Sequence, residues 1–295
     1  MATLRELKGR ICSVASSEKI TGAMKMISSA KMHKAEGALR RLVPFRNQIE
    51  TIIANLLSTD ATFSSPLVEP RQEVRRVAIV VLGSDDGLCG AYNVNLAKQL
   101  AATLDELRER YGMGLEVDIY PVGRKMAKAV VKYATGRVSV VSDITVDSKS
   151  DGQAVKDFTR ALEDSFTGRQ VDEVRLLYMH YHSAGRQTVR NECLLPVESS
   201  NFSAEGIKAT GRPCIFEPDA QTIFSSVLPM FLLSVMQEAF AENRASEQAA
   251  RVMAMQSAND NAKKLLEQLR LEFNKLRQQS ITTELLDIVG GQIKD

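Results

Sequence analysis

The pattern of hydrophobic and polar positions predicts one long helix at each end of the chain. From Thr3 to Leu57 a helix-favouring composition is interrupted only by three glycines and one proline. The last proline of the chain is Pro229, and no glycine lies between Gly211 and Gly290. At about 1.5 Å per residue, such helices would extend roughly 80 to 100 Å. Because no small domain can bury helices of that length, the pattern favours a coiled coil.

Apolar stripes support this pairing. Near the C-terminus the alternating three-and-four spacing of a coiled-coil seam is followed by Leu266, Leu269, Phe273 and Leu276. Upstream the same frame runs through Ala245, Ala249, Val252, Gln256 and Asn259, and downstream it shifts to Ile281, Leu285 and Ile288. The N-terminal helix carries two stripes, made of Leu4, Leu7, Ile11 and Val14, and of Ile49, Ile52, Ile53, Leu56 and Leu57. Both terminal helices are therefore expected to be amphipathic.

Between the two N-terminal stripes, small residues and methionines surround the helix instead of lining one face, from Ile20 to His33. One interpretation is a tightly packed antiparallel pair in which methionine fills irregular gaps. The other is a segment that touches more than one surrounding surface. The sequence leaves both open.

The middle of the chain predicts an α/β domain, because strand-length apolar runs alternate with stretches of helical periodicity. The expected strands are Val77–Leu82, Leu115–Tyr120, Val138–Val141 and Val174–Met179, and the expected helices are Asn93–Tyr111, Arg124–Ala134 and Gly152–Phe166. This alternation is typical of a mainly parallel, doubly wound sheet. A last strand, Asn191–Val197, is expected near an edge because Pro196 cannot donate to a central ladder. The predicted domains are 1–57, 74–215 and 217–295.

The middle domain shows no convincing active site. The loop from Gly83 to Gly90 has the position of a phosphate-binding turn, but it lacks lysine and is acidic at Asp85 and Asp86. No histidine lies near Cys89 in sequence. His180 and His182 would share one face of a strand as two metal ligands, yet no third ligand is in view, so an ordinary edge-strand pair is favoured. We therefore expect no catalytic residue, cofactor or metal.

The distribution of charge along the chain narrows the kinds of partner that the protein could bind. The net charge is only +2, but residues 1–57 carry ten Lys or Arg against four Glu, and residues 217–295 carry eight against eleven Asp or Glu. The basic N-terminal helix could attract the C-terminal helix or an acidic protein partner. Nucleic acid is disfavoured because the basic residues lack interleaved aromatics.

Three further features concern the compartment. The apolar window Ile223–Phe240 is expected to be a buried helix, since it falls short of about 20 uninterrupted apolar residues. No secretory signal is visible. Four scattered cysteines, Cys12, Cys89, Cys193 and Cys214, suggest neither a disulfide framework nor a zinc site, and fit a reducing compartment.

Several segments carry a family resemblance when taken together. These are Leu7–Ile11, Lys19–Met26, Ser84–Asn93, Ala245–Arg251, Asn274–Thr282 and Glu284–Gly291. In their order and their spacing to both termini, the chain resembles the gamma subunit of rotary ATP synthase over essentially its whole length. The resemblance implies an antiparallel coiled coil of the terminal helices inside a ring of three alpha and three beta subunits. It also implies an α/β foot near the epsilon subunit and the membrane c-ring.

The resemblance further implies a non-catalytic shaft that couples proton or sodium flow to ATP synthesis at alpha and beta sites. It places the chain on the cytoplasmic face of the bacterial inner membrane, through its complex and without a transmembrane segment of its own. Motif position implies that Met24, Lys25 and Arg251 face the acidic lever segment of the beta subunit. Gln278 and Thr282 fall in the motif of the upper bearing and catch region. No nucleic acid is expected as a partner.

The chain departs from the family pattern at two positions. Gly22 stands where a helix-favouring residue, often Lys, is common, which makes the role of Lys25 less secure. Asp86 occupies a position that is often Lys. Two other functions stay open at this stage, namely a passive coiled-coil adaptor and a nucleotide-using α/β enzyme with helical arms.

Overall fold

The computed structural model describes residues 3–57, 63–197 and 216–291. The chain divides into two compact units. Residues 1–29 with 251–295 form one unit, which we call the terminal helix pair, and residues 30–250 form the other, which we call the body. Cys214 and the predicted domain limit at residue 215 lie outside the described residues. The three predicted domain ranges stay predictions.

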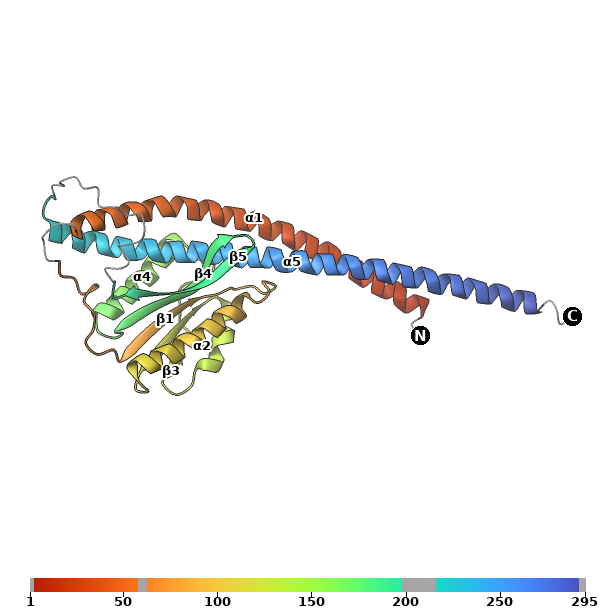
Figure 1. Ribbon diagram of the computed structural model, residues 1–295, viewed down its shortest axis with the longest axis horizontal. Helices are drawn as coiled ribbons and strands as arrows, with labels where there is room; N and C mark the ends of the chain where they lie inside the picture. Colours follow the sequence, from red (N-terminus) through yellow and green to blue (C-terminus); the bar gives the residue numbers. More distant parts are fainter. Residues whose placement is uncertain (1–2, 58–62, 198–215, 292–295) are drawn as a thin grey trace. The chain divides into compact units, whose positions relative to one another are not determined.

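Two long helices confirm the prediction for the chain ends: α1 spans Leu4–Leu57 and α5 spans Ala220–Gly291. A capping box starts α1, because the Thr3 backbone N–H donates to Glu6 Oε2 (2.8 Å) and the Glu6 N–H donates to Thr3 Oγ1 (3.3 Å). Asp219 caps α5 by accepting the Thr222 N–H (2.8 Å). In the terminal helix pair, as in the body, α1 and α5 lie side by side and antiparallel (Figure 1).

The body contains the predicted doubly wound sheet. Its strands are β1 Arg76–Leu82, β2 Glu116–Val122, β3 Val138–Val140, β4 Glu173–Ser183 and β5 Arg186–Leu195, in the order β3-β2-β1-β4-β5. The connecting helices are α2 Tyr92–Tyr111, α3 Arg124–Val130 with a 3-10 turn at Val131–Tyr133, and α4 Gly152–Thr167. All pairings are parallel except that of β4 with β5. The fold class expected from the sequence is confirmed.

The last strand differs from the prediction in length. Residues 186–195 form β5, the antiparallel partner of β4, and the two make a hairpin with its turn at Ala184–Gly185. The edge position is confirmed, and Pro196 follows the strand. His180 and His182 do not lie on an edge strand, because β4 is between β1 and β5. They belong to the part of β4 that extends past its pairing with β1, which ends at Leu177.

Two apolar layers cover the sheet. One face, with Val77, Ile79 and Val81 of β1, packs against α2 and α3. The other face, with Ala78, Val80 and Leu82, packs against α4 and against the parts of α1 and α5 that belong to the body. This alternation is the period of a strand buried on both sides.

The apolar window of α5 is a buried core segment of the body. Most of its large side chains are buried, among them Phe224, Leu228, Phe231, Leu232, Met236 and Phe240, whereas Met230 is exposed. By length and composition alone, α5 is the one described helix apolar enough to cross a membrane, with half of its most apolar window buried. The burial agrees with the expected core helix.

We predict that Gly83→Ala destabilises the chain, because a Cβ there would lie 2.3 Å from the Cβ of buried Met126. Relieving that overlap should cost about 2 kcal/mol or more of unfolding free energy. Gly87→Ala in the same loop is the control, since its nearest atom would be 3.7 Å away. Urea unfolding of both variants checks this. Equal midpoints would contradict the packing described here.

Candidate subunit-interaction site

The five residues singled out from the sequence all belong to the terminal helix pair. Met24 and Lys25 on α1 are half-buried, and Gln278 and Thr282 on α5 are exposed. The Thr282 hydroxyl donates to the Gln278 carbonyl one turn earlier (2.9 Å), so these two side chains share a face. Arg251 differs from the others because only 6% of it is exposed. Three of the four more accessible side chains are polar, as suits contact with another chain.

A polar contact fixes the register of the two helices in the seam. Asn259 is buried, and its Nδ2 donates to the Glu18 carbonyl (2.6 Å) and to Thr21 Oγ1 (3.2 Å). A buried asparagine in a coiled-coil seam specifies register at some expense of stability. A Cβ at Gly22 would lie 3.3 Å from the same Nδ2. Gly22, which departs from the family pattern, therefore leaves room for Asn259.

The predicted seam is correct at its centre and wrong at its end. Leu266 and Leu269 are buried, and Phe273 and Leu276 are half-buried. Ile281, Leu285 and Ile288 were expected to continue the stripe, but 49–62% of each is exposed. The reason is that α5 extends past the first turn of α1 (Figure 1), so none of the helices that the structure describes covers them. Leu286 and Val289 are also exposed.

Exposed apolar side chains also occur on α1. Ile20, Met26 and Ile27 are 56–69% exposed, while Met32 in the body is buried. Monomeric proteins rarely leave such groups clustered in water, so they indicate a surface covered by a partner. These residues favour the second interpretation of the methionine-rich segment, in which it meets a surface outside the chain.

A run of buried and partly buried polar residues fastens α5 to the sheet and to the segment before α4 within the body, and sequence reasoning missed it. Asn243 Nδ2 donates to the Gly83 carbonyl (3.0 Å), and its Oδ1 accepts from the Tyr92 hydroxyl (2.5 Å). Ser246 donates to the Met179 carbonyl (3.0 Å), and Arg244 Nη2 donates to the Ser150 carbonyl (2.7 Å). The only signal in the sequence was a polar stretch where the coiled-coil frame has alanines, Ala245 and Ala249.

The loop after β1 has a structural role in the described chain, because its side chains bond to neighbouring segments. Asp85 is buried, where its Oδ1 accepts the Arg124 N–H (3.0 Å) and its Oδ2 accepts the Ser148 hydroxyl (2.8 Å). Asp86 lies 3.4 Å from both Arg124 Nη2 and Lys149 Nζ. These two cations give a physical reason for the acidic residue at this position. Cys89 is buried beside Ser84 Oγ (3.7 Å).

A cluster of charged side chains joins α1, α5 and the β4–β5 hairpin inside the body. Arg46 contacts Glu50 (2.7 Å) and Glu238 (2.6 Å). His180 Nδ1 lies 2.6 Å from Glu242 Oε2, and Arg190 contacts Glu192 (3.0 Å). Burial alone would lower the pKa of Arg46, but the charges of Glu238 and Glu50 raise it above its ordinary value.

The His180–Glu242 pair holds one proton over a wide pH range. Burial, together with the charge of Glu238, raises the pKa of Glu242 to about 8 from an ordinary 4.5. Burial, with the charge of Arg190, lowers the pKa of His180 to about 4 from 6.5. Between these values the folded pair carries a single proton, held by Glu242 while His180 is neutral.

The two histidines have partners other than a metal. Their rings pack edge to face with centroids 4.4 Å apart, which confirms that they share a face of the strand. His182 Nε2 lies 2.9 Å from Thr188 Oγ1. Across the described ranges no cluster of three or more His, Cys, Asp or Glu side chains is arranged to hold a metal ion.

We predict that the chain loses stability as pH rises from about 7 to 8.5. The folded pair keeps its proton up to pH 8, whereas the unfolded pair has released it above pH 6.5, so the unfolded state binds fewer protons in this window. The loss should be on the order of 1 kcal/mol. Glu242→Gln, which imitates the protonated side chain, should flatten the dependence in urea unfolding. An equal slope in the variant would contradict a proton retained by Glu242.

We predict that Gly22→Ala stabilises the terminal helix pair only when Asn259 is also replaced. Alanine favours a helix over glycine by about 1 kcal/mol, but in the wild type the new Cβ would push the Asn259 amide from its place. In an Asn259→Ala background that conflict is gone. Amide hydrogen exchange of residues 14–29 in the wild type, the two single variants and the double variant gives the coupling free energy between the two positions. Additive effects would rule out the proposed reason for Gly22.

Comparison with known proteins agrees with this geometry. Residues 3–293 match a family model described as ATP synthase. A protein of Phocaeicola vulgatus named ATP synthase gamma chain is 41% identical over 99% of this chain and its own full length. One of Leptospira biflexa with the same name is 32% identical over 99% of this chain and 98% of its own.

Solved structures show the same fold at lower identity. A chain in the Euglena gracilis mitochondrial ATP synthase has a TM-score of 0.62 at 20% identity and covers 98% of this chain and 93% of its own. A chain of the central stalk and c-ring of the Tetrahymena thermophila enzyme has a TM-score of 0.53 at 21% identity, over 81% and 99%. From its full-length match and its sequence identity to these relatives, the chain belongs to the ATP synthase gamma-chain family.

Proposed function

We propose that this chain is the central rotor shaft of an ATP synthase, turning inside a ring of three alpha and three beta subunits. The full-length match to gamma chains is the observation that carries the proposal. The exposed apolar residues on α1 and at the end of α5 support it, because a shaft needs a surface that other subunits cover. The shaft couples proton or sodium flow to ATP synthesis and hydrolysis, and is itself non-catalytic.

Coupling requires a shaft whose contact energy differs among the three catalytic subunits, since the coupling free energy can be no larger than that difference. The terminal helix pair is asymmetric, because α5 continues alone past α1. Polar side chains such as Gln278 and Thr282 on that end keep contacts modest. A Leu or Phe fixed in a partner pocket would gain about 1.5–3 kcal/mol and resist turning.

The foot of the shaft is the α/β domain at residues 74–215, which packs near the epsilon subunit and the membrane c-ring. Through that complex the chain resides on the cytoplasmic face of the bacterial inner membrane. Met24, Lys25 and Arg251 serve contacts with the beta-subunit lever segment, and Gln278 and Thr282 serve the bearing and catch region. The accessibility of Gln278 and Thr282 supports their assignment, whereas the burial of Arg251 leaves little of it for a partner.

ATP hydrolysis by cognate alpha and beta subunits, with and without this chain, tests the function. The expected result is a complex with one copy per three alpha and three beta subunits and strongly increased turnover. A chain that joins without changing turnover would be a passive adaptor. A chain that does not join a competent mixture of alpha and beta would end the rotor proposal.

We predict that Gln278→Ala changes the turnover of the assembled complex about twofold to tenfold, as expected for the loss of one or two hydrogen bonds to a partner. Because the side chain is exposed, the stability of the free chain should not change. Gln268→Ala, on an exposed position of α5 outside the motif, is the matched control. Unchanged turnover with intact coupling would remove Gln278 from the interaction site.

Arg251→Ala should also alter turnover or coupling, but here a stability control is essential because the side chain is buried. Arg251→Lys keeps the charge and tests whether the guanidinium itself is needed. If only the stability of the free chain falls, Arg251 acts in packing and not in contact with the beta subunit.

A further inference from the structure

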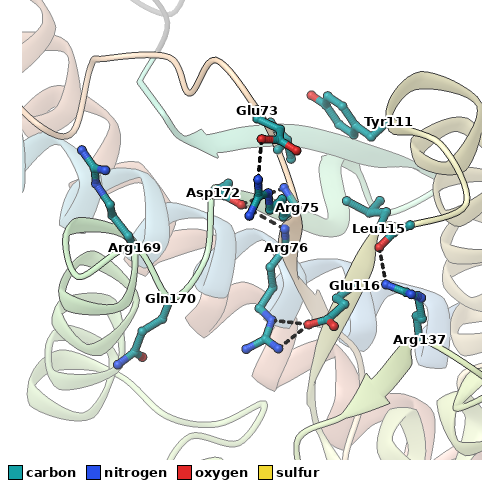
Figure 2. Close-up of a pocket in the computed structure, with 12 residues that line it drawn as sticks. Glu73, Arg75, Arg76, Tyr111, Leu115, Glu116, Arg137, Arg169, Gln170 and Asp172 are labelled. Atoms are coloured by element: carbon teal, nitrogen blue, oxygen red, sulfur yellow. Dashed lines mark hydrogen bonds and ion pairs between the residues drawn. The ribbon is translucent and has the colours of Figure 1, made fainter.

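A wide polar groove lies at the amino ends of the parallel strands. The loop after β1 lies at the opposite, carboxyl ends of these strands. We call it the amino-edge groove; it measures about 860 Å³. Figure 2 shows its main side chains, which come from the start of β1, the start of β2, the segment before β3 and the turn after α4. The charged residues of its lining include Arg75, Arg76, Glu116, Arg137, Arg169 and Asp172.

The carboxylates of the groove have partners inside the body. Glu116 faces Arg76 across the β1–β2 pairing, with Arg76 Nε 3.0 Å from its Oε2. Glu73 pairs with Arg75 (2.7 Å). Asp172 Oδ2 accepts the backbone N–H groups of Arg75 (2.8 Å) and Arg76 (3.0 Å), which holds the entry to β1. These negative charges are therefore already compensated.

Two guanidinium groups of the groove, those of Arg137 and Arg169, have no such carboxylate partner among the described residues. Arg137 Nη1 donates to the Gly114 carbonyl (2.8 Å). Arg169 lies exposed in the turn after α4, where its φ of 56° is in the left-handed region. Within the described ranges neither forms an ion pair with a carboxylate; the charge of Arg137 helps to lower the pKa of Glu116, but Glu116 is already paired with Arg76.

An adjoining hollow of about 240 Å³ extends the positive surface, because it shares Val74, Tyr111 and Asp172 with the groove. In it Arg71 stacks over Phe166 (4.8 Å) and donates to the Phe166 carbonyl (2.9 Å). Arg110 stacks over Tyr111 (5.1 Å). Together the linings hold seven arginines against four carboxylates. Arg175 and Arg76 also reach carboxylates beside the linings, Glu106 (3.6 Å) and Asp118 (3.8 Å), so the excess positive charge rests on the other arginines.

The chemistry of the surface selects the kind of partner. Guanidinium groups bind carboxylates through paired hydrogen bonds and are weakly hydrated, so they suit protein interfaces. The interspersed Glu73, Glu116 and Asp172 divide the arginines into separate positions, so the surface lacks the continuous row of cations that follows a polyphosphate backbone. Tyr111 is the one aromatic residue in the two linings, which gives little stacking for nucleic acid.

We propose that the amino-edge groove docks an acidic segment of another protein subunit, with Arg137 and Arg169 as its anchoring cations. This deepens the proposed function and rests on it, since it names a surface by which the body meets the rest of the assembly. An apolar partner does not suit a groove lined mainly by charged side chains. Coulomb attraction here is screened by salt, because these side chains are exposed.

Photo-crosslinking in the assembled complex tests the docking surface. A benzoylphenylalanine replaces Gln170, an exposed and uncharged residue of the groove that is not one of the anchoring cations. The expected product is an adduct to a segment of another subunit in which Asp and Glu outnumber Lys and Arg. Its yield should fall several-fold when Arg137→Glu and Arg169→Glu are combined, and it should fall as salt rises.

The matched control carries the same change of charge at Lys98→Glu and Lys128→Glu, two exposed positions on α2 and α3. It should leave the yield unchanged. An adduct to a segment without acidic excess, to lipid or to nucleic acid would overturn the proposal, as would no adduct or equal loss in both double variants. Failure of the chain to join alpha and beta subunits is a separate result, which would overturn the rotor function itself.

Discussion

The structure depends on how α5 is held along its length. One continuous helix of 72 residues supplies the core of the body and half of the terminal helix pair. In the body it is buried through Phe224, Phe231 and Phe240, and the Asn243 amide then bonds to the end of β1. Apolar burial supplies most of the free energy, whereas the directional bonds fix the rotation of the helix about its axis. A shaft that receives torque needs both the apolar burial and the directional hydrogen bonds.

The two units use different polar contacts to fix the position of α5. In the terminal helix pair Asn259 selects the register, and Gly22 provides its space. In the body the cluster around Arg46, Glu238 and Glu242 joins two helices to a hairpin. That cluster contains more carboxylates than guanidiniums, so it retains a proton, which reduces its negative charge. The amino-edge groove has the opposite imbalance and lies open to water, where a partner and not a proton can balance it.

The sequence predicted what depends on period and composition. The long helices, the parallel order of the strands and the buried window of α5 follow from local patterns of apolar residues. The end of the seam at Ile281 could not be predicted, because a stripe does not reveal where its partner helix begins. Asn243 and the groove arginines were also missed. Their roles arise only when the sheet brings β1, β2 and α4 to one place, and a polar residue in a helix looks the same whether buried or exposed.

The central claim, that the chain turns as one shaft, is tested most directly by watching it rotate. With alpha and beta subunits fixed to a surface, a bead is attached to a cysteine introduced at exposed Lys98, after exposed Cys12 is replaced by serine. We expect full revolutions in one direction that require ATP. A bead that stays fixed or wanders without direction, while the same complexes hydrolyse ATP, would contradict it.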